Sequence, residues 1–276
     1  MRGRKHSYAE EVLRPDETFE GYVVDSVLGQ GGSATVYRAR AADTQQPVAL
    51  KVLADDRAGP DQMTRLHREF DFAQRLSHPH IVCVYRRGDT WLSMQFIDGG
   101  TAAGLDELDD RLTALEQIAA ALDYAHWRGV VHCDVKPTNV LVHQAFSNAG
   151  AVLIDFGVAY AVSEDIGRSP QPLVASLPYL APEMLRGHAP SAATDEYALA
   201  CTAVELVTGA PPFACATPDG VADAQLYEPP PYFSRRFGWL PRGFDGVIGK
   251  AIAKDPELRY PTCAEFVAAV KRVFRH

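Results

Sequence analysis

Two short segments of the sequence carry side chains that could accept a proton and bind a metal ion. Residues 132–139 read HCDVKPTN, and residues 155–157 read DFG. Asp134 could accept the proton of a hydroxyl group, and Asn139 and Asp155 offer the oxygen ligands that Mg²⁺ prefers. Lys136 adds a positive charge beside them. A base next to metal ligands predicts phosphoryl transfer, because that reaction depends on positioning and on charge neutralisation. A lone Asp-x-Asn would instead be read as a pair of turn formers.

A glycine-rich segment lies upstream, at residues 29–36 (GQGGSATV), next to alternating apolar stretches at residues 22–28 and 36–39. This pattern predicts a strand, a loop and a second strand. Glycines allow backbone N–H groups to approach phosphates because no Cβ intervenes, although an ordinary hairpin turn has the same appearance. Ala34 stands where a third glycine would complete the pattern, and it is small enough to be tolerated.

A single lysine, Lys51, ends the apolar stretch VAL at residues 48–50. Such a lysine is either a solvated charge at a strand end or an anchor for the α- and β-phosphates of a nucleotide. Residues 62–76 predict a helix, because their apolar positions recur every three or four residues. Glu69 lies beside this apolar stripe, where it could pair with Lys51 or form a surface ion pair with Arg65.

Together these segments resemble the eukaryotic-type (Hanks-type) Ser/Thr protein kinases, in particular their bacterial receptor-like branch, over about residues 19–274. The resemblance implies an α+β fold of the bilobal protein-kinase type. A small β-rich N-terminal lobe would span residues 1–97 and a larger α-helical C-terminal lobe residues 98–276, with the nucleotide between them. The implied cofactors are ATP and Mg²⁺ or Mn²⁺, and the implied substrates are protein hydroxyl groups, those of the chain itself included.

The resemblance assigns a role to each residue of these motifs. Asp134, Lys136, Lys51 and Glu69 would be catalytic, with Glu69 preferred to Asp61 and Asp71 as the partner of Lys51. Asn139 and Asp155 would bind the metal. Met94 would be the gatekeeper beside a hinge at residues 95–97. The implied nucleotide-binding residues are Leu28, Gly29, Gly31, Val36, Ala49, Lys51, Met94, Gln95, Ile97 and Leu141.

Further motifs are implied to have structural roles. Glu183, in the sequence APE at residues 181–183, would form a buried pair with Arg259. Asp195 would tie the helix that contains residues 199–207 to the catalytic loop. Lys136, in the pattern Asp-x-Lys-Pro-x-Asn, is typical of kinases that act on Ser and Thr. Small-molecule kinases of related fold generally lack the APE segment and its arginine.

Two departures from the family pattern point to an unusual mode of regulation. Cys133 replaces an arginine that commonly pairs with a phosphorylated residue of the activation segment. Residues 155–183 also contain no threonine; their hydroxyl groups belong to Tyr160, Ser163, Ser169, Ser176 and Tyr179. We therefore expect activity that does not depend on activation-loop phosphorylation.

Cys133 and Ser176 are open to interpretation. Cys133 is read as a small buried apolar residue, with a redox sensor as the alternative. Ser176 occupies the position of a threonine that bonds the catalytic Asp and Lys in relatives.

Composition agrees with this interpretation. The 276 residues are 47% hydrophobic and carry a net charge of −8, which argues against nucleic acid as a partner. Five cysteines without paired spacing indicate a reducing compartment, and the cysteines and histidines show no metal-ligand spacing.

We expect a cytoplasmic chain without a signal peptide or membrane span. The basic end at residues 271–276 is either a plain helix terminus or the start of a linker to a missing single membrane span.

Two functions from different classes remain open at the level of the sequence. The first is an active Ser/Thr protein kinase in signalling. The second is a pseudokinase-like scaffold, or a weakly active kinase gated by a partner. All five polar site residues are present, which favours activity. Homodimerisation is an expectation from the relatives alone.

Overall fold

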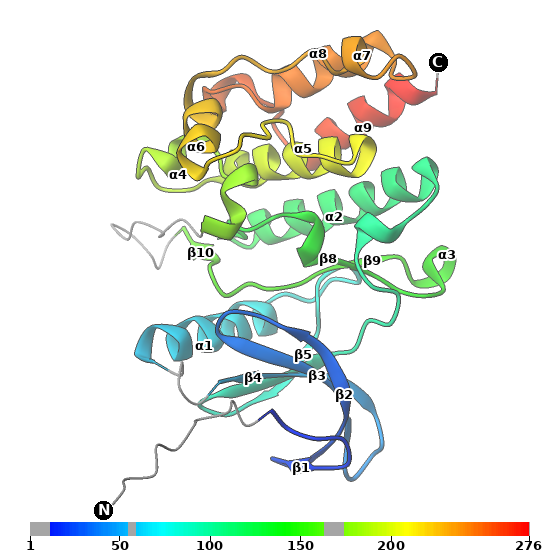
Figure 1. Cartoon of the computed structure of the whole chain (residues 1–276), viewed down its shortest axis with the longest axis vertical. Helices are drawn as coiled ribbons and strands as arrows, with labels where there is room; N and C mark the ends of the chain where they lie inside the picture. Colours follow the sequence, from blue (N-terminus) through cyan, green and yellow to red (C-terminus); the bar gives the residue numbers. More distant parts are fainter. Residues whose placement is uncertain (1–11, 55–58, 163–173, 276) are drawn as a thin grey trace, which may run out of the picture. The chain divides into compact units, whose positions relative to one another are not determined.

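The computed structural model describes residues 12–54, 59–162 and 174–275. The chain divides into two compact units, one built from residues up to Gln74 together with Val82–Phe96, the other from Arg75–Ile81 and from Ile97 onward. The first is a β-sheet with one helix and the second is mainly helical (Figure 1), so the predicted α+β fold class is confirmed. Of the hydroxyl groups considered above, those of Ser163 and Ser169 lie outside the described residues.

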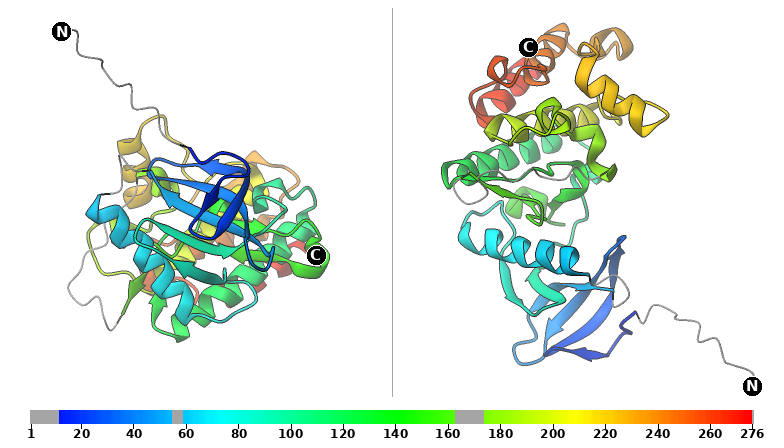
Figure 2. Two further views of the ribbon diagram at one scale, coloured as in Figure 1. Left: turned by 90° about the horizontal axis from the view of Figure 1, so that it is seen from below. Right: turned by 90° about the vertical axis from the view of Figure 1, so that its left-hand side faces the viewer.

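The first unit contains one six-stranded antiparallel sheet with the strand order β1-β2-β3-β4-β6-β5. The strands are β1 (Thr18–Phe19), β2 (Tyr22–Gln30), β3 (Ala34–Ala41), β4 (Pro47–Leu53), β5 (Val84–Arg87) and β6 (Trp91–Gln95). Helix α1 (Pro60–Arg75) lies beside this sheet (Figures 1 and 2). Its apolar stripe is the one that the sequence predicts, since Leu66, Phe70 and Ala73 are all buried.

The register of this sheet separates its residues into two faces, because side chains alternate along a strand. One face is an apolar cluster made of Tyr22, Val24, Tyr37, Ala39, Val48, Leu50 and Trp91. On β4, Ala49 and Lys51 point to the other face. The partner of Ala49 across the ladder is Met94, and the partner of Lys51 is Val36. The sheet therefore collects Val36, Ala49, Lys51 and Met94 on one face.

The second unit is mainly helical. Its longer helices are α2 (Leu108–Trp127), α5 (Ala192–Thr208), α6 (Pro218–Tyr227), α8 (Arg242–Ala251) and α9 (Cys263–Phe274). Its shorter helices are α3 (Phe146–Ala149), α4 (Pro182–Leu185) and α7 (Phe233–Arg236), with 3₁₀ turns η2 (Ala102–Gly104), η3 (Pro137–Asn139), η4 (Val174–Tyr179) and η5 (Pro256–Leu258). Two small antiparallel ladders pair β7 (Val130–Val131) with β10 (Tyr160–Ala161) and β8 (Val140–Val142) with β9 (Ala151–Leu153). Residues 75–81 join this unit, since the backbone N–H of Leu153 donates to His80 O at 2.9 Å.

Helix α5 is the core of the second unit. It contacts α2, α8 and α9 (Figures 1 and 2), and nearly all its side chains are buried, as expected for a helix surrounded by protein. Ser191 and Thr194 form a capping box at its start, and Gly209 ends it in the left-handed conformation that glycine favours (φ +84°). These two signals fix which residues of α5 belong to its first turn, and Asp195 is one of them.

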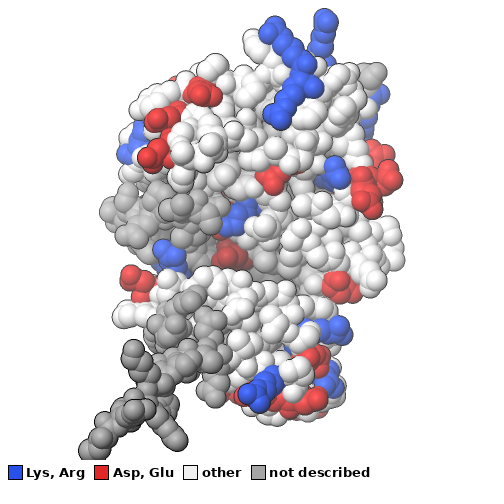
Figure 3. Space-filling view, in the orientation of Figure 1, with Lys and Arg blue, Asp and Glu red and all other residues white. Residues whose placement is uncertain are grey.

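Charged side chains of both signs are interspersed on the face drawn in Figure 3, with basic side chains prominent around α7. Among the described residues, no helix is both long and apolar enough to cross a membrane.

Glu196, the neighbour of Asp195 on α5, is a buried acid whose burial is offset only in part by its surroundings. Its side chain is 1% exposed, and neither carboxylate oxygen has a hydrogen-bond partner among the described residues. Burial raises the pKa of Glu196 to about 9, whereas the charges of Arg259 and Lys250 and the nearby Tyr260 amide lower it by less. The carboxyl group is therefore protonated at neutral pH.

This protonation makes the stability of the fold depend on pH in a predictable direction. The folded chain holds a proton on Glu196 between the ordinary pKa of 4.5 and about 9, whereas the unfolded chain releases it. Stability is thus highest at low pH in this window and falls as the pH rises, by about 1.4 kcal/mol per pH unit at most. The Glu196→Gln variant removes this term because glutamine carries no titratable proton.

We expect urea unfolding at pH 6, 7 and 8 to show a growing difference between the two proteins. The free energy of unfolding of Glu196→Gln should rise relative to that of the wild type by about 1 kcal/mol per pH unit. The exposed Glu257 supplies a matched control. The unfolding free energy of Glu257→Gln should change with pH as that of the wild type does. A constant difference between wild type and Glu196→Gln across the three pH values would contradict this assignment.

Candidate active site

The segment between β7 and β8 holds the candidate base of the second unit. Asp134 is buried, and its Oδ2 atom accepts hydrogen bonds from Lys136 Nζ at 2.8 Å and from Asn139 Nδ2 at 3.0 Å. Asn139 Nδ2 also donates to the backbone oxygen of Asp134 at 2.8 Å. The other carboxylate oxygen, Oδ1, is buried without a hydrogen-bond partner among the described residues. One oxygen is thus held in place while the other is available to accept a proton.

Proline fixes the turn that brings these side chains together. Residues Pro137–Asn139 form η3 with the proline in its first turn, where its fixed φ suits a helix start. The turn folds Asn139 back onto Asp134. Lys136 Nζ also donates to Ser176 Oγ at 2.9 Å, which connects the loop to η4. Lys136 is therefore oriented from two sides.

The β8–β9 hairpin places the two candidate metal ligands at one end of a ladder. Val140 pairs with Leu153, and Ile154 N donates to Asn139 O at 3.0 Å, so Asn139 and Asp155 follow the same end of the hairpin. Asp155 has a left-handed backbone (φ +68°), a conformation that aspartate tolerates, and its Oδ1 accepts from Gly157 N at 3.3 Å. Because Asn139 donates through Nδ2, its Oδ1 remains as an acceptor. A carboxylate and an amide oxygen fit a hard cation such as Mg²⁺.

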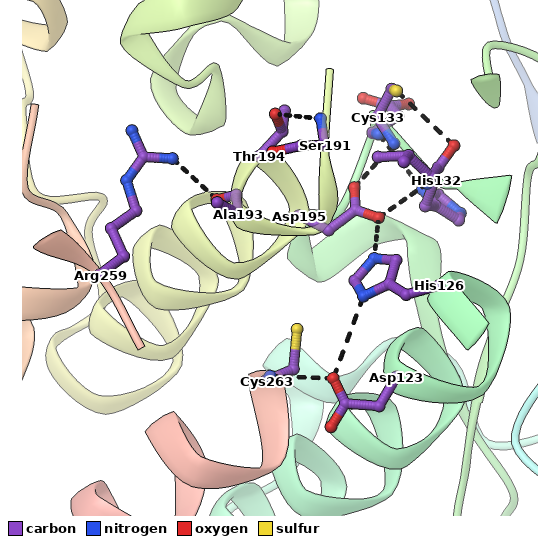
Figure 4. Close-up of polar contacts among 12 residues, drawn as sticks. Asp123, His126, His132, Cys133, Ser191, Ala193, Thr194, Asp195, Arg259 and Cys263 are labelled. Carbon is purple, nitrogen blue, oxygen red and sulfur yellow. Dashed lines mark hydrogen bonds and ion pairs between the residues drawn. The ribbon is translucent and has the colours of Figure 1, made fainter. Parts of the chain in front are cut away.

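Asp195 of α5 anchors the start of the catalytic segment (Figure 4). It is fully buried, and it accepts hydrogen bonds from His132 N at 2.7 Å, from Cys133 N at 2.8 Å and from His126 Nε2 at 2.8 Å. Burial alone would raise the pKa of Asp195, but the hydrogen bonds and electrostatic interactions with His126 and His132 outweigh it and hold the pKa below its ordinary value. The anchor is therefore an ionised carboxylate at neutral pH.

Cys133 is held by this anchor in a left-handed conformation (φ +66°) that is uncommon for a residue other than glycine, asparagine or aspartate. Such a conformation costs on the order of 1–3 kcal/mol and persists where neighbouring contacts enforce it. Cys133 is partly buried and its Sγ donates to Val131 O at 3.6 Å. Its thiol faces a backbone carbonyl, a geometry in keeping with a small packed residue.

A buried ion pair joins α4 to the segment before α9. Arg259 Nη2 lies 2.7 Å from Glu183 Oε2, and Arg259 Nη1 donates to Glu183 Oε1 at 2.8 Å. Thr194 Oγ1 also donates to Glu183 Oε1, and Arg259 bonds the carbonyl oxygens of Ala193 and Ala253. Burial would raise the pKa of Glu183, but the hydrogen bond and the charge of Arg259 lower it by more. The pKa of Glu183 therefore lies below its ordinary value. Both charges are matched, as a buried pair requires.

In the first unit, Lys51 Nζ lies 2.6 Å from Glu69 Oε2, and the glutamate side chain is only 3% exposed. The structure therefore pairs Lys51 with Glu69 and not with Asp61 or Asp71. A Cβ added at Gly29 would meet no atom of the chain within 4 Å, so the chain's own packing does not demand glycine there. Open space beside a glycine suits the close approach of a ligand.

The remaining predicted nucleotide residues divide between the two units. Gly31, Val36, Ala49, Met94 and Gln95 belong to the first, together with the exposed Leu28. Ile97 and Leu141 belong to the second, in which Leu141 pairs with Val152 and bridges to Thr101. All of these residues except Ile97 lie on strands or directly beside a strand end.

Sequence reasoning missed two residues that support the site, His126 and Gln225. His126 is the third donor to Asp195. Gln225 of α6 is fully buried, and its Nε2 donates to the carbonyl oxygens of Leu177 at 3.3 Å and Pro178 at 2.6 Å, in η4. The hydroxyl group of Tyr197 donates to Gln225 in turn. Each of these contacts joins residues far apart in the sequence, and no local pattern marks such a pair.

Comparison with known proteins places these observations in a family. A model of the protein kinase domain matches residues 22–266. The serine/threonine-protein kinase PknJ of Mycobacterium tuberculosis is 40% identical over 270 residues, which cover 93% of this chain and 46% of PknJ. PknF of the same organism is 38% identical over 276 residues, which cover 94% of this chain and 57% of PknF. The chain spans about half the length of the curated relatives it matches.

Solved structures agree with this result. The crystal structure of the M. tuberculosis PknI kinase domain has a TM-score of 0.73 and 32% sequence identity, and the match covers 96% of this chain and 100% of that one. A mutant of the same kinase domain gives a TM-score of 0.71, and that match covers 95% of this chain and 99% of the mutant. A matching family model over most of the sequence, relatives near 40% identity and a shared fold lead to one conclusion: the chain belongs to the protein kinase domain family.

Proposed function

We propose that this chain is a protein-serine/threonine kinase that transfers the γ-phosphoryl group of ATP to hydroxyl groups of proteins, itself included. The observation that carries the proposal is the state of Asp134. Its Oδ2 is held by Lys136 and Asn139, and its Oδ1 is buried and free of hydrogen bonds among the described residues. An oriented carboxylate with one available oxygen is what a hydroxyl nucleophile needs. Relatives at about 40% identity carry the name serine/threonine-protein kinase.

Each polar residue of the site has a role in this proposal. Asp134 Oδ1 accepts the proton of the substrate hydroxyl group. Lys136 neutralises charge on the γ-phosphoryl group, and Ser176 keeps its ammonium group in position. Lys51, oriented by Glu69, holds the α- and β-phosphates. These assignments rest on the distances within each unit, which bring every polar group to a partner of suitable chemistry.

The protein kinase family uses ATP with Mg²⁺, and we propose that Asn139 and Asp155 hold the metal. Mg²⁺ neutralises the negative charge of the phosphates and bridges their oxygens when it is bound. Asn139 Nδ2 is committed to Asp134, which orients the amide so that its oxygen is left for a cation. Protein substrates and ATP are thus the proposed partners, and homodimerisation stays a prediction.

The second candidate function, a scaffold or a kinase gated by a partner, draws on Cys133. A cysteine cannot form the bidentate contact with a phosphate group that an arginine forms. The complete set of polar residues in the site favours activity over scaffolding. We therefore propose an active kinase in which the end of the activation segment, at η4, is held by contacts other than a phosphate–arginine pair. Among these contacts are the Gln225 bonds to η4 and the hydrogen bond from Tyr179 to Glu205.

Phosphate incorporation from ATP into the purified chain and into a generic basic protein tests the proposed activity. We expect Asp134→Asn to lower the rate by roughly 10²- to 10⁴-fold, because asparagine cannot accept a proton. Lys51→Met should also abolish incorporation, since the phosphate anchor is lost. The exposed Glu257→Gln serves as the matched control with unchanged rates. A folded wild-type chain that binds nucleotide but incorporates nothing would favour the scaffold.

Ser176 offers a finer test of the site. Ser176→Ala removes an acceptor from a charged donor, Lys136 Nζ, and we expect kcat to fall on the order of tenfold or more while KM for ATP changes little. Ser176→Thr retains the hydroxyl group and should retain most of the activity. Equal losses in the two variants would show that the hydroxyl group is not what matters at this position.

Dependence on phosphorylation can be measured directly. Initial rates should agree within about twofold before and after treatment with a phosphatase, because Cys133 supplies no guanidinium group for a phosphate to engage. Mass spectrometry of the treated chain establishes that the phosphate groups have been removed. A large loss of activity on dephosphorylation would overturn this part of the proposal.

A further inference from the structure

Three side chains with different metal-binding chemistry meet where α2 faces the start of α9, away from the proposed catalytic residues in the sequence (Figure 4). Asp123 and His126 lie one turn apart on α2, and Cys263 is the first residue of α9. One ligand atom of each lies within 4.8 Å of the other two. Side chains at positions i and i+3 share a helix face, and a carboxylate and a histidine at this spacing bind metal ions in helical bundles.

Two backbone hydrogen bonds orient the carboxylate of Asp123. Its Oδ1 accepts from Cys263 N at 2.9 Å and its Oδ2 accepts from Ala264 N at 3.0 Å. Each carboxylate oxygen has lone pairs beyond the one that such a bond uses. Asp123 can therefore bind a cation without giving up its contacts with the first turn of α9.

The ring of His126 is oriented for the same purpose. Its Nε2 lies 2.8 Å from Asp195 Oδ2, and its Nδ1 lies 4.0 Å from Asp123 Oδ1. Asp195 is ionised and can only accept, so the hydrogen is assigned to Nε2. In the neutral ring the lone pair of Nδ1 then points toward Asp123. A histidine that ligates metal commonly donates its other N–H to a carboxylate in this way.

The third group is the thiol of Cys263, at the first position of α9. Its side chain is 1% exposed, whereas the side chains of Asp123 and His126 are 25% and 12% exposed, so the cluster is closed on the sulfur side and reachable from solvent on the other. The nearby carboxylates of Asp123 and Asp195 add negative charge beside the sulfur, and a cation bound at this point would offset that charge.

We propose that Asp123, His126 Nδ1 and Cys263 Sγ form a binding site for a zinc ion, with water as the fourth ligand. Zinc accepts carboxylate, imidazole and thiolate together in tetrahedral geometry. Binding exchanges the thiol proton for the metal: the S–H bond breaks, a sulfur–zinc bond forms and one proton is released. Bond lengths of about 2.0–2.3 Å place tetrahedral ligand atoms roughly 3.3–3.8 Å apart, so shifts of about 1 Å or less close the site.

Zinc at this position would reinforce the support of the catalytic loop. The ion holds His126 on one side, and the same ring donates to Asp195, which accepts the backbone N–H groups of His132 and Cys133. A cation on Nδ1 makes the Nε2–H group a stronger donor. The site thus links α2, α9 and α5. It lies outside the phosphoryl-transfer residues and does not depend on the proposed kinase activity.

The test uses the chain with Cys83 and Cys215 changed to serine, because these exposed thiols could bind metal on their own. Titration with Zn²⁺ against a chromophoric chelator should give one site, and bound zinc should raise the melting temperature. Cys263→Ser and Asp123→Asn should each weaken binding by about tenfold or more. Cys201→Ser, which removes another buried thiol in α5, is the matched control and should bind zinc unchanged.

A second measurement keeps all three ligands intact, so its result does not depend on whether a ligand variant folds. Co²⁺ loaded into the same serine background should show a thiolate-to-cobalt charge-transfer band, and X-ray absorption of the zinc form should show one sulfur among nitrogen and oxygen neighbours. Equal zinc affinity in folded Cys263→Ser, absence of a sulfur neighbour, or loss of binding in Cys201→Ser alone would each overturn the proposal.

Discussion

The buried carboxylate of Asp195 is the interaction that holds the candidate active site together. It receives three N–H groups, two of them from consecutive backbone positions, His132 and Cys133. Those two bonds hold Cys133 in its left-handed conformation and so set the direction in which the chain continues to Asp134. An unpaired buried N–H group costs roughly 1–3 kcal/mol, so the loop cannot readily leave this anchor. The position of the base is thus decided by a residue of α5.

Three acids in or beside the first turn of α5 show how surroundings decide the state of a carboxyl group. Asp195 and Glu183 are buried but well supplied with donors, and the pKa of each lies below its ordinary value. Glu196 is equally buried but has no hydrogen bond among the described residues, and its pKa is raised. Burial raises the pKa of all three, and in Asp195 and Glu183 hydrogen-bond donors together with neighbouring charges outweigh it. The anchor and the ion pair are therefore charged, whereas Glu196 is neutral.

Cys133 and Ser176 differ from the residues that relatives carry at these positions, and each has its own contacts in this structure. The backbone N–H group of Cys133 donates to Asp195, and its thiol donates to the backbone carbonyl oxygen of Val131. Ser176 keeps a hydroxyl group, whose oxygen accepts a hydrogen bond from Lys136 Nζ. The polar residues of the candidate site are all present, and only Cys133 replaces a residue through which a phosphate group would act in relatives. The proposal of a kinase regulated without a phosphate–arginine pair rests on this one position.

Local patterns in the amino-acid sequence were enough to predict the family, the α+β class, the strands around the glycine-rich segment and helix α1. Glycine spacing, strand alternation and the stripe of α1 are such patterns, because period and backbone preference act over a few residues. Motif spacing likewise predicted roles for Asp134, Asn139 and Asp155, which are close in sequence. The preference for Glu69 as the partner of Lys51 came from the family pattern, and the 2.6 Å distance agrees with it.

Which distant groups meet could be learned from the folded chain alone. Gln225 reaches η4 from 48 residues away, and Asp123 caps α9 across 140 residues. The sequence indicated no metal-ligand spacing among cysteines and histidines, yet Asp123, His126 and Cys263 converge. Convergence of this kind follows from the packing of whole helices, which no short pattern encodes. The protonation of Glu196 and the availability of Asp134 Oδ1 have the same origin, since burial and donors belong to the folded chain.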